Sequence, residues 1–219
     1  MKRRANWWWA VAALAVTVLV AVIEDWQAPD IVWGMWISSL VSGYVMILLI
    51  IAGSVMHGHN PAAEDDQTAT LRGRLVGAVG MLAFFSFHFL FFHAGHAMFT
   101  QQFFPLPGAD TDAHELIDNF LTVTPLALSN YWPMVLAAVA TSGDALRGAV
   151  RGDARKSMAL PYRAVAKNHV MIFIVAGLTM AGLQGWLLYQ LFLWYFVPGE
   201  VWRPLLSRAG ARASPEQDR

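Results

Sequence analysis

The side chains best suited to chemistry are histidines inside apolar stretches, because polar groups are costly in a membrane and mark functional sites. One apolar stretch holds His88, His93 and His96, and a later stretch holds His169. At about 100° per residue, His88 and His96 lie roughly 80° apart on one helix face. Neutral imidazole is a common ligand of zinc, copper, iron and haem. The pattern predicts a transition-metal or haem site built from His88, His96 and His169.

Depth in the membrane supports a shared site. With a rise of about 1.5 Å per residue, four predicted helices each place one polar side chain roughly 10–20 Å below the outer surface: Ser38, His88, Asn130 and His169. We therefore expect His88 and His169 to face each other across their helices. Ser38, Asn130 and His93 are expected around the metal rather than on it.

Other functions fit parts of the same pattern. Mid-membrane histidines and a proline-interrupted helix also fit a small-solute transporter or proton relay. Buried serine and histidine would suit an intramembrane serine hydrolase, but Leu40 stands where a Gly-x-Ser-Gly motif ending at Gly43 needs its first glycine. An accessory or assembly protein without chemistry of its own is a further alternative. The sequence therefore leaves open whether the protein is an enzyme.

The elements that carry these residues follow from hydropathy. Of 219 residues, 57% are hydrophobic and 14% charged, whereas soluble domains are about half apolar and about a quarter charged. Apolar stretches long enough to cross a bilayer are followed by one longer tract: 7–23, 31–55, 75–99, 121–141 and then 161–202. The pattern predicts an all-α, polytopic transmembrane bundle. It forms one domain over 1–208, and 209–219 is predicted to be a disordered cytoplasmic tail.

Basic residues decide how many helices the last tract holds. Segments 24–30 and 99–121 carry acidic residues but no Lys or Arg. A hairpin of two helices, broken near Gly182–Gly185, puts every basic segment on the cytoplasmic side, as the positive-inside rule requires. A single helix would leave the basic tail outside. We therefore predict six helices rather than five, with the N-terminus in the cytoplasm. The first stretch is read as a retained helix, because no small-residue cleavage site follows it.

Charge and cysteine content limit the partners. The formal net charge is zero, so no electrostatic field favours nucleic acid. The absence of cysteine excludes thiolate metal ligands, disulfides and cysteine nucleophiles. The lipid bilayer is the partner that the sequence predicts, and protein partners are left open.

Three short motifs carry a resemblance to a known family. The stretch His88 to Phe99, in which Gly95 precedes His96 eight positions after His88, resembles the third-helix motif of a bacterial membrane-protein family catalogued as domain of unknown function six-four-nine-eight. Pro161-Tyr162-Arg163 before a histidine-bearing helix, and Trp36 through Gly43, are similar to two further family motifs. The resemblance covers roughly residues 30–200. It implies six helices in a bacterial inner membrane and no particular activity.

Two departures from the family pattern matter. The family's Glu-Asn falls on Ser38-Ser39, and its Ser-His falls on Ser129-Asn130. If relatives hold a metal at these positions, this chain has lost a carboxylate and an imidazole. The resemblance then implies weaker metal binding here, and restoring Glu and His should strengthen it.

Overall fold

The computed structural model describes residues 7–58, 70–109, 115–150 and 159–182. These residues form helices and turns without any strand, which confirms the all-α bundle. Six helices follow in chain order: α1 (Trp7–Ile23), α2 (Ala28–Met56), α3 (Leu71–Phe103), α4 (Leu116–Thr141), α5 (Gly143–Val150) and α7 (Ala159–Met180). Five coincide with predicted helices, and the short α5 was not predicted. The second arm of the predicted hairpin and the tail 209–219 lie outside the described residues.

Within the described part of the chain, three helices have the length and composition to cross a membrane, namely α2, α3 and α4, and α1 and α7 contain shorter apolar helices. The outer side of α3 shows what such a helix presents. Val79, Phe84, Phe87 and Phe91 are all more than 60% exposed, although a soluble bundle would hide them. A helix that is apolar on its exposed side as well as its buried side is typical of a lipid-facing span. The fold fits an integral membrane protein.

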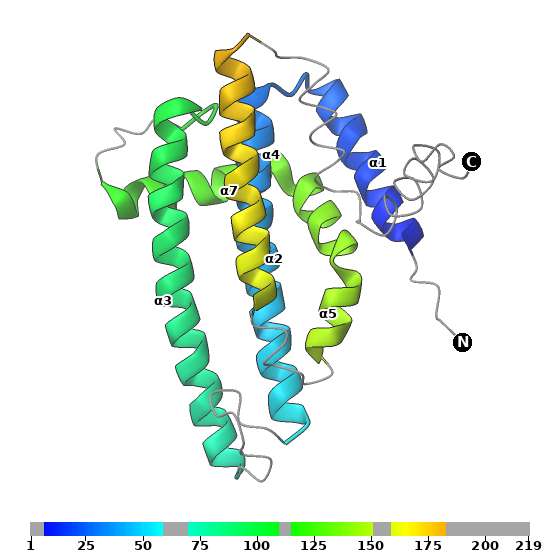
Figure 1. The fold of residues 1–219 in the computed structure, drawn as a ribbon, viewed down its shortest axis with the longest axis vertical. Coiled ribbons are helices and arrows are strands. Elements are labelled where there is room, and N and C mark those ends of the chain that lie inside the picture. Colours follow the sequence, from blue (N-terminus) through cyan, green and yellow to red (C-terminus); the bar gives the residue numbers. More distant parts are fainter. Residues whose placement is uncertain (1–6, 59–69, 110–114, 151–158, 183–219) are drawn as a thin grey trace, which may run out of the picture.

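Helix α2 forms the centre of the bundle and packs against α4, α7, α3 and α5. In Figure 1 it runs behind α7, between α3 and α5. Its first half is buried on all sides, including the fully buried Trp33 and Trp36. Glycines allow the neighbours to approach closely: Gly34 faces Met134 of α4, and Gly43 faces Phe89 of α3. The close approach brings α3 and its histidines against the aromatic part of α2.

Helix α4 bends at Tyr131, whose backbone angles (φ −117°, ψ 22°) are not helical. The cause is Pro133, which lacks an N–H group and whose ring clashes with the carbonyl four residues earlier. The bend is held from two sides. The Tyr131 hydroxyl donates to an Asp30 carboxylate oxygen at 2.7 Å, and the Thr17 hydroxyl donates to the Pro133 carbonyl at 2.8 Å. In Figure 1 the first half of α4 runs across the bundle, and the second half turns down toward α5.

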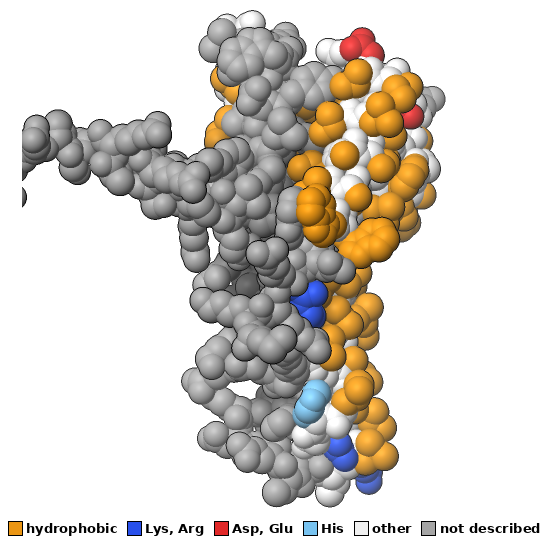
Figure 2. All heavy atoms as spheres, turned by 90° about the vertical axis from the view of Figure 1, so that its right-hand side faces the viewer, with side chains coloured by type: hydrophobic (Ala, Val, Ile, Leu, Met, Phe, Trp, Pro, Cys, Tyr) orange, Lys and Arg blue, Asp and Glu red, His pale blue; other side chains and the backbone are white. Residues whose placement is uncertain are grey.

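Opposite charges occupy the two ends of the bundle. The turn between α1 and α2 carries Glu24 and Asp25, and α3 begins at the other end with Arg72 and Arg74. The Arg74 guanidinium donates to the Val55 carbonyl at 2.8 Å, so the end of α2 and the start of α3 are joined. Figure 2 shows acidic side chains at the top, basic ones in the lower half and an apolar surface between them. We call these the acidic end and the basic end.

Candidate functional site

The buried seam of α3 decides which histidines face the interior. Its members recur about every four residues: Met81, Phe85, Phe89, His93, Ala97 and Gln101. His93 is 1% exposed and His96 8% exposed, so both lie on this face. His88 is exposed, because five helical residues place it about 140° from His93. The expectation that His88, rather than His93, faces the interior is therefore not met.

His93 is held in one orientation by its neighbours. Its Nδ1 lies 2.9 Å from the Phe89 carbonyl oxygen. Because a carbonyl only accepts, Nδ1 carries the proton in the neutral ring, and Nε2 carries the lone pair. The indole N–H of Trp36 donates to the His93 carbonyl at 3.2 Å. The imidazole also packs on Phe89, with ring centroids 4.2 Å apart. A backbone hydrogen bond that fixes the tautomer is the usual support of a metal-binding histidine.

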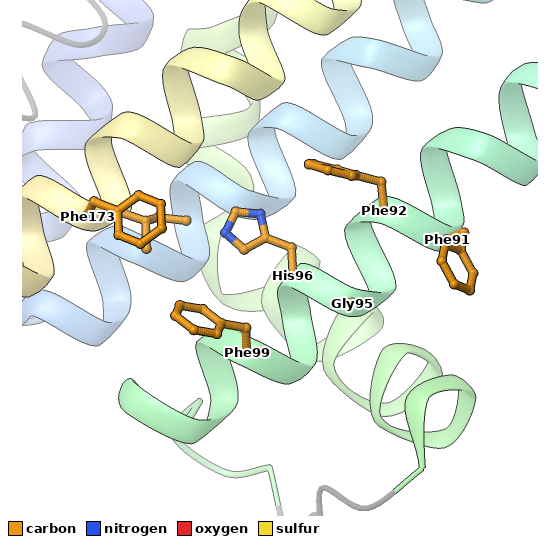
Figure 3. A pocket seen from close by; sticks show the side chains of 7 residues that line it. Phe91, Phe92, Gly95, His96, Phe99 and Phe173 are labelled. Atoms are coloured by element: carbon orange, nitrogen blue, oxygen red, sulfur yellow. The ribbon is translucent and has the colours of Figure 1, made fainter.

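His96 lies in the wall of a pocket of about 330 Å³ between α3 and α7. Six other residues line it: Phe91, Phe92, Gly95, Phe99, Ile172 and Phe173. Figure 3 shows the His96 ring reaching from α3 toward α7, with Phe92 one turn before it and Phe99 one turn after it. His96 is the polar side chain among the lining residues, so the pocket can hold an apolar molecule with one hydrogen-bonding group.

Two ring contacts set the register between α3 and α7, which run in the same direction. Tyr162 lies 5.8 Å from His88, and Phe173 lies 6.4 Å from Phe99, measured between ring centroids. Each pair is separated by 74 positions in the sequence, which makes His169 level with residue 95. The side chain of His169 lies outside the described residues, but its place along α7 is between the levels of His93 and His96.

The same register separates His169 from the histidine predicted to face it. His88 is level with Tyr162, seven residues before His169. At about 1.5 Å per residue, the two levels differ by about 10 Å. A metal site formed by His88 and His169 alone is therefore unfavourable. His93 and His96 lie closer to the level of His169 along the two helices.

Ser38 and Asn130 do not share one depth. The pairs Asp30–Tyr131 and Gly34–Met134 place each α4 residue level with an α2 residue about 100 positions earlier. Ser38 is thus level with a residue near 138, whereas Asn130 is level with the start of α2. Along the helix axes, the levels of Ser38 and Asn130 differ by about 12 Å at 1.5 Å per residue. Ser38 is buried, whereas Asn130 is exposed and accepts a hydrogen bond from Ser129. The bend in α4 is the reason, because counting from the outer end assumed a straight helix.

Several buried groups of α3 and α4 were not predicted from the sequence. Phe120 of α4 packs against Trp36, with ring centroids 6.0 Å apart. Its neighbour Asn119 is 2% exposed, and neither of its side-chain polar atoms has a hydrogen-bond partner among the described residues. Thr100, one helical turn after His96, is also buried, and its hydroxyl has no partner among the described residues. The four-residue spacing from Phe89 onward was the signal that could have found the seam.

Metal ligation is not complete within the described part of the chain. There, no three His, Asp or Glu side chains come close enough to hold a metal ion. Since His93 and His96 lie on one face, a third ligand would have to come from a residue whose side chain is not described. His169 of α7 is the histidine at the right level.

The family is shown by the sequence. The family described as "Family of unknown function (DUF6498)" matches residues 1–196. The chain belongs to this family. No curated protein and no solved structure matches it significantly. Membership in DUF6498 confirms the resemblance read from the third-helix motif, and it assigns no activity. What the protein does must therefore be inferred from the geometry of α3 and α7.

Proposed function

We propose that this protein is an integral membrane protein that binds a transition metal through His93, His96 and His169. One observation carries the proposal: His93 and His96 are both buried on the same face of α3, three residues apart. Histidines or carboxylates three apart on one helix, completed by a residue of a facing helix, are a common way to build a metal site inside a bundle. The ring pairs Tyr162–His88 and Phe173–Phe99 support this set, because their common spacing of 74 positions puts His169 at the level of residue 95.

The chemistry of the three side chains favours particular metals. Neutral imidazole nitrogens suit zinc and copper better than calcium or magnesium, which prefer oxygen. His93 would bind through Nε2, because its Nδ1 faces the Phe89 carbonyl. His93 and His96 lie three residues apart on one helix, a spacing that lets both imidazoles reach a single metal ion.

The test is metal content in the purified protein. Protein loaded with Zn²⁺ or Cu²⁺ and dialysed should retain about one ion per chain. His93→Ala, His96→Ala and His169→Ala should each weaken binding by more than about 100-fold, since loss of an outer hydrogen-bond partner alone costs roughly 10–100-fold. His88→Ala is the matched control on the same helix and should bind normally. Absence of binding in the wild type, or equal loss in the control, contradicts the proposal and favours an accessory protein.

The membrane and the orientation are part of the same proposal. We infer a bacterial inner membrane from the family resemblance, and a cytoplasmic N-terminus from the charges at the two ends of the bundle. Arg72 and Arg74 belong to the basic end and Glu24 and Asp25 to the acidic end. Alkaline phosphatase, which is active only outside the cytoplasm, should therefore work when fused after position 110 and fail when fused after position 60. The reverse pattern would show the opposite orientation.

A further inference from the structure

We propose that the pocket between α3 and α7 binds a lipid-soluble ring that carries a carbonyl or hydroxyl oxygen, such as a quinone. This inference shares His96 with the metal proposal but needs no bound metal. The pocket has a volume of about 330 Å³, within the usual range for small-molecule sites. Its phenylalanines are partly exposed, at 43–64% for Phe92, Phe99, Phe173 and Phe91. A ligand could therefore enter from the surface that the bilayer covers.

The lining favours an aromatic or quinonoid ring over an acyl chain. Four of the seven lining residues are phenylalanine. Phe92 meets the His96 imidazole edge-on, with centroids 6.4 Å apart, and Phe99 meets Phe173 at 6.4 Å in a tilted arrangement. Rings placed at such angles offer both faces and edges to a further ring, and each aromatic pair contributes binding energy beyond simple burial. An acyl chain would gain only the burial.

His96 supplies the polar recognition. Its imidazole reaches into the space between α3 and α7 (Figure 3), where it can donate to a carbonyl or accept from a hydroxyl. A saturated acyl chain has no atom that can form a hydrogen bond with the His96 imidazole. His96 also lies seven residues before the end of α3 at Phe103, about 10 Å from the acidic end of the helix at 1.5 Å per residue. A polar ring at that depth leaves its apolar tail to follow Phe87 and Phe84 along the exposed side of α3.

Gly95 lines the pocket and leaves space in it, because it has no side chain. A Cβ atom built on Gly95 would meet no other atom within 4 Å, so a ring can approach the backbone there. A larger side chain at this position would fill the pocket without striking the core. Gly80 of the same helix is likewise open to 4 Å, and it does not line the pocket. The two glycines form a matched pair for testing the pocket.

The experiment measures quenching of tryptophan fluorescence by a benzoquinone bearing a ten-carbon chain, with n-decanol as competitor. Wild type and Gly80→Leu should show saturable binding that decanol does not displace. Gly95→Leu should bind at least about 10-fold more weakly, a loss of about 1.4 kcal/mol, with an unchanged melting temperature. Unaltered binding in Gly95→Leu, displacement by decanol or quenching without saturation would each overturn the proposal.

The metal proposal is tested separately in the same assay. Chelator-treated protein and the His93→Ala variant should bind the quinone as the wild type does, because His93 does not line the pocket. His96→Ala should weaken quinone binding by roughly 10-fold, through loss of one hydrogen bond. If ring binding persists while metal binding is absent, only the proposed function fails. If metal binds and the quinone does not, only the pocket assignment fails.

Discussion

Gly43→Ala is expected to destabilise the bundle by about 2–3 kcal/mol, the upper part of the usual range for overpacked cores. A Cβ atom on Gly43 would fall on the ring of Phe89. That ring cannot retreat, because Phe85 stacks on it with centroids 4.5 Å apart and the His93 imidazole lies 4.2 Å away on another side. The strain must therefore separate α2 from α3. The measurement is thermal unfolding of the purified protein in detergent.

The control for this variant is Gly80→Ala on α3. A Cβ atom at Gly80 meets nothing within 4 Å, so the change should raise stability by up to about 1 kcal/mol through the better helix propensity of alanine. Because Phe89 accepts the hydrogen bond of His93 through its carbonyl, Gly43→Ala should also lower metal retention. A melting temperature in Gly43→Ala equal to that of the wild type would show that α2 and α3 are less closely packed than described.

The helices themselves could be predicted from the sequence because length and hydropathy decide a membrane span. The first apolar stretch, 7–23, coincides with α1. Helix α3 begins four residues earlier than predicted, at Leu71, because the Thr70 hydroxyl accepts a hydrogen bond from the backbone N–H of Gly73 and caps the helix. Hydropathy cannot show that polar first turn, since Arg72 and Arg74 end the apolar pattern. The end of α7 could be predicted from the glycines near position 182, and Gly182 has a positive φ of 69°.

The site was less predictable because it depends on contacts between helices. Three histidines on one helix define two overlapping faces, and only packing shows which is buried. Trp36 packs against the His93 imidazole with ring centroids 6.1 Å apart and so marks the buried face, and no spacing rule connects residue 36 with residue 93. The predicted depth of Asn130 in the membrane was wrong for a second reason. The bend at Tyr131 moves Asn130 to the level of Asp30, so a count from the outer end of α4 gives the wrong position.

These levels reverse the expectation for restoring the family residues at Ser38 and Asn130. The sequence alone suggested that Ser38→Glu with Asn130→His would strengthen metal binding. The two positions differ in level by about 12 Å at 1.5 Å per residue, and a histidine at the exposed position 130 cannot reach a ligand of residue 38. Asn130→His alone should leave the metal content unchanged. It should change the free energy of unfolding by no more than about 0.5 kcal/mol, as for most exposed substitutions.

Ser38→Glu should have the larger effect and lower stability by several kcal/mol. Ser38 is 1% exposed, and its hydroxyl has no hydrogen-bond partner among the described residues. A carboxylate placed there would lose its hydration, and a buried charge without a partner costs several kcal/mol. Thermal unfolding in detergent measures the loss, and Asn130→Glu is the control because it adds the same charge at an exposed position. If Ser38→Glu has the melting temperature of the wild type and binds an additional metal ion, then a cation site lies beside α2. Position 38 would then have to be included among the metal ligands near His93.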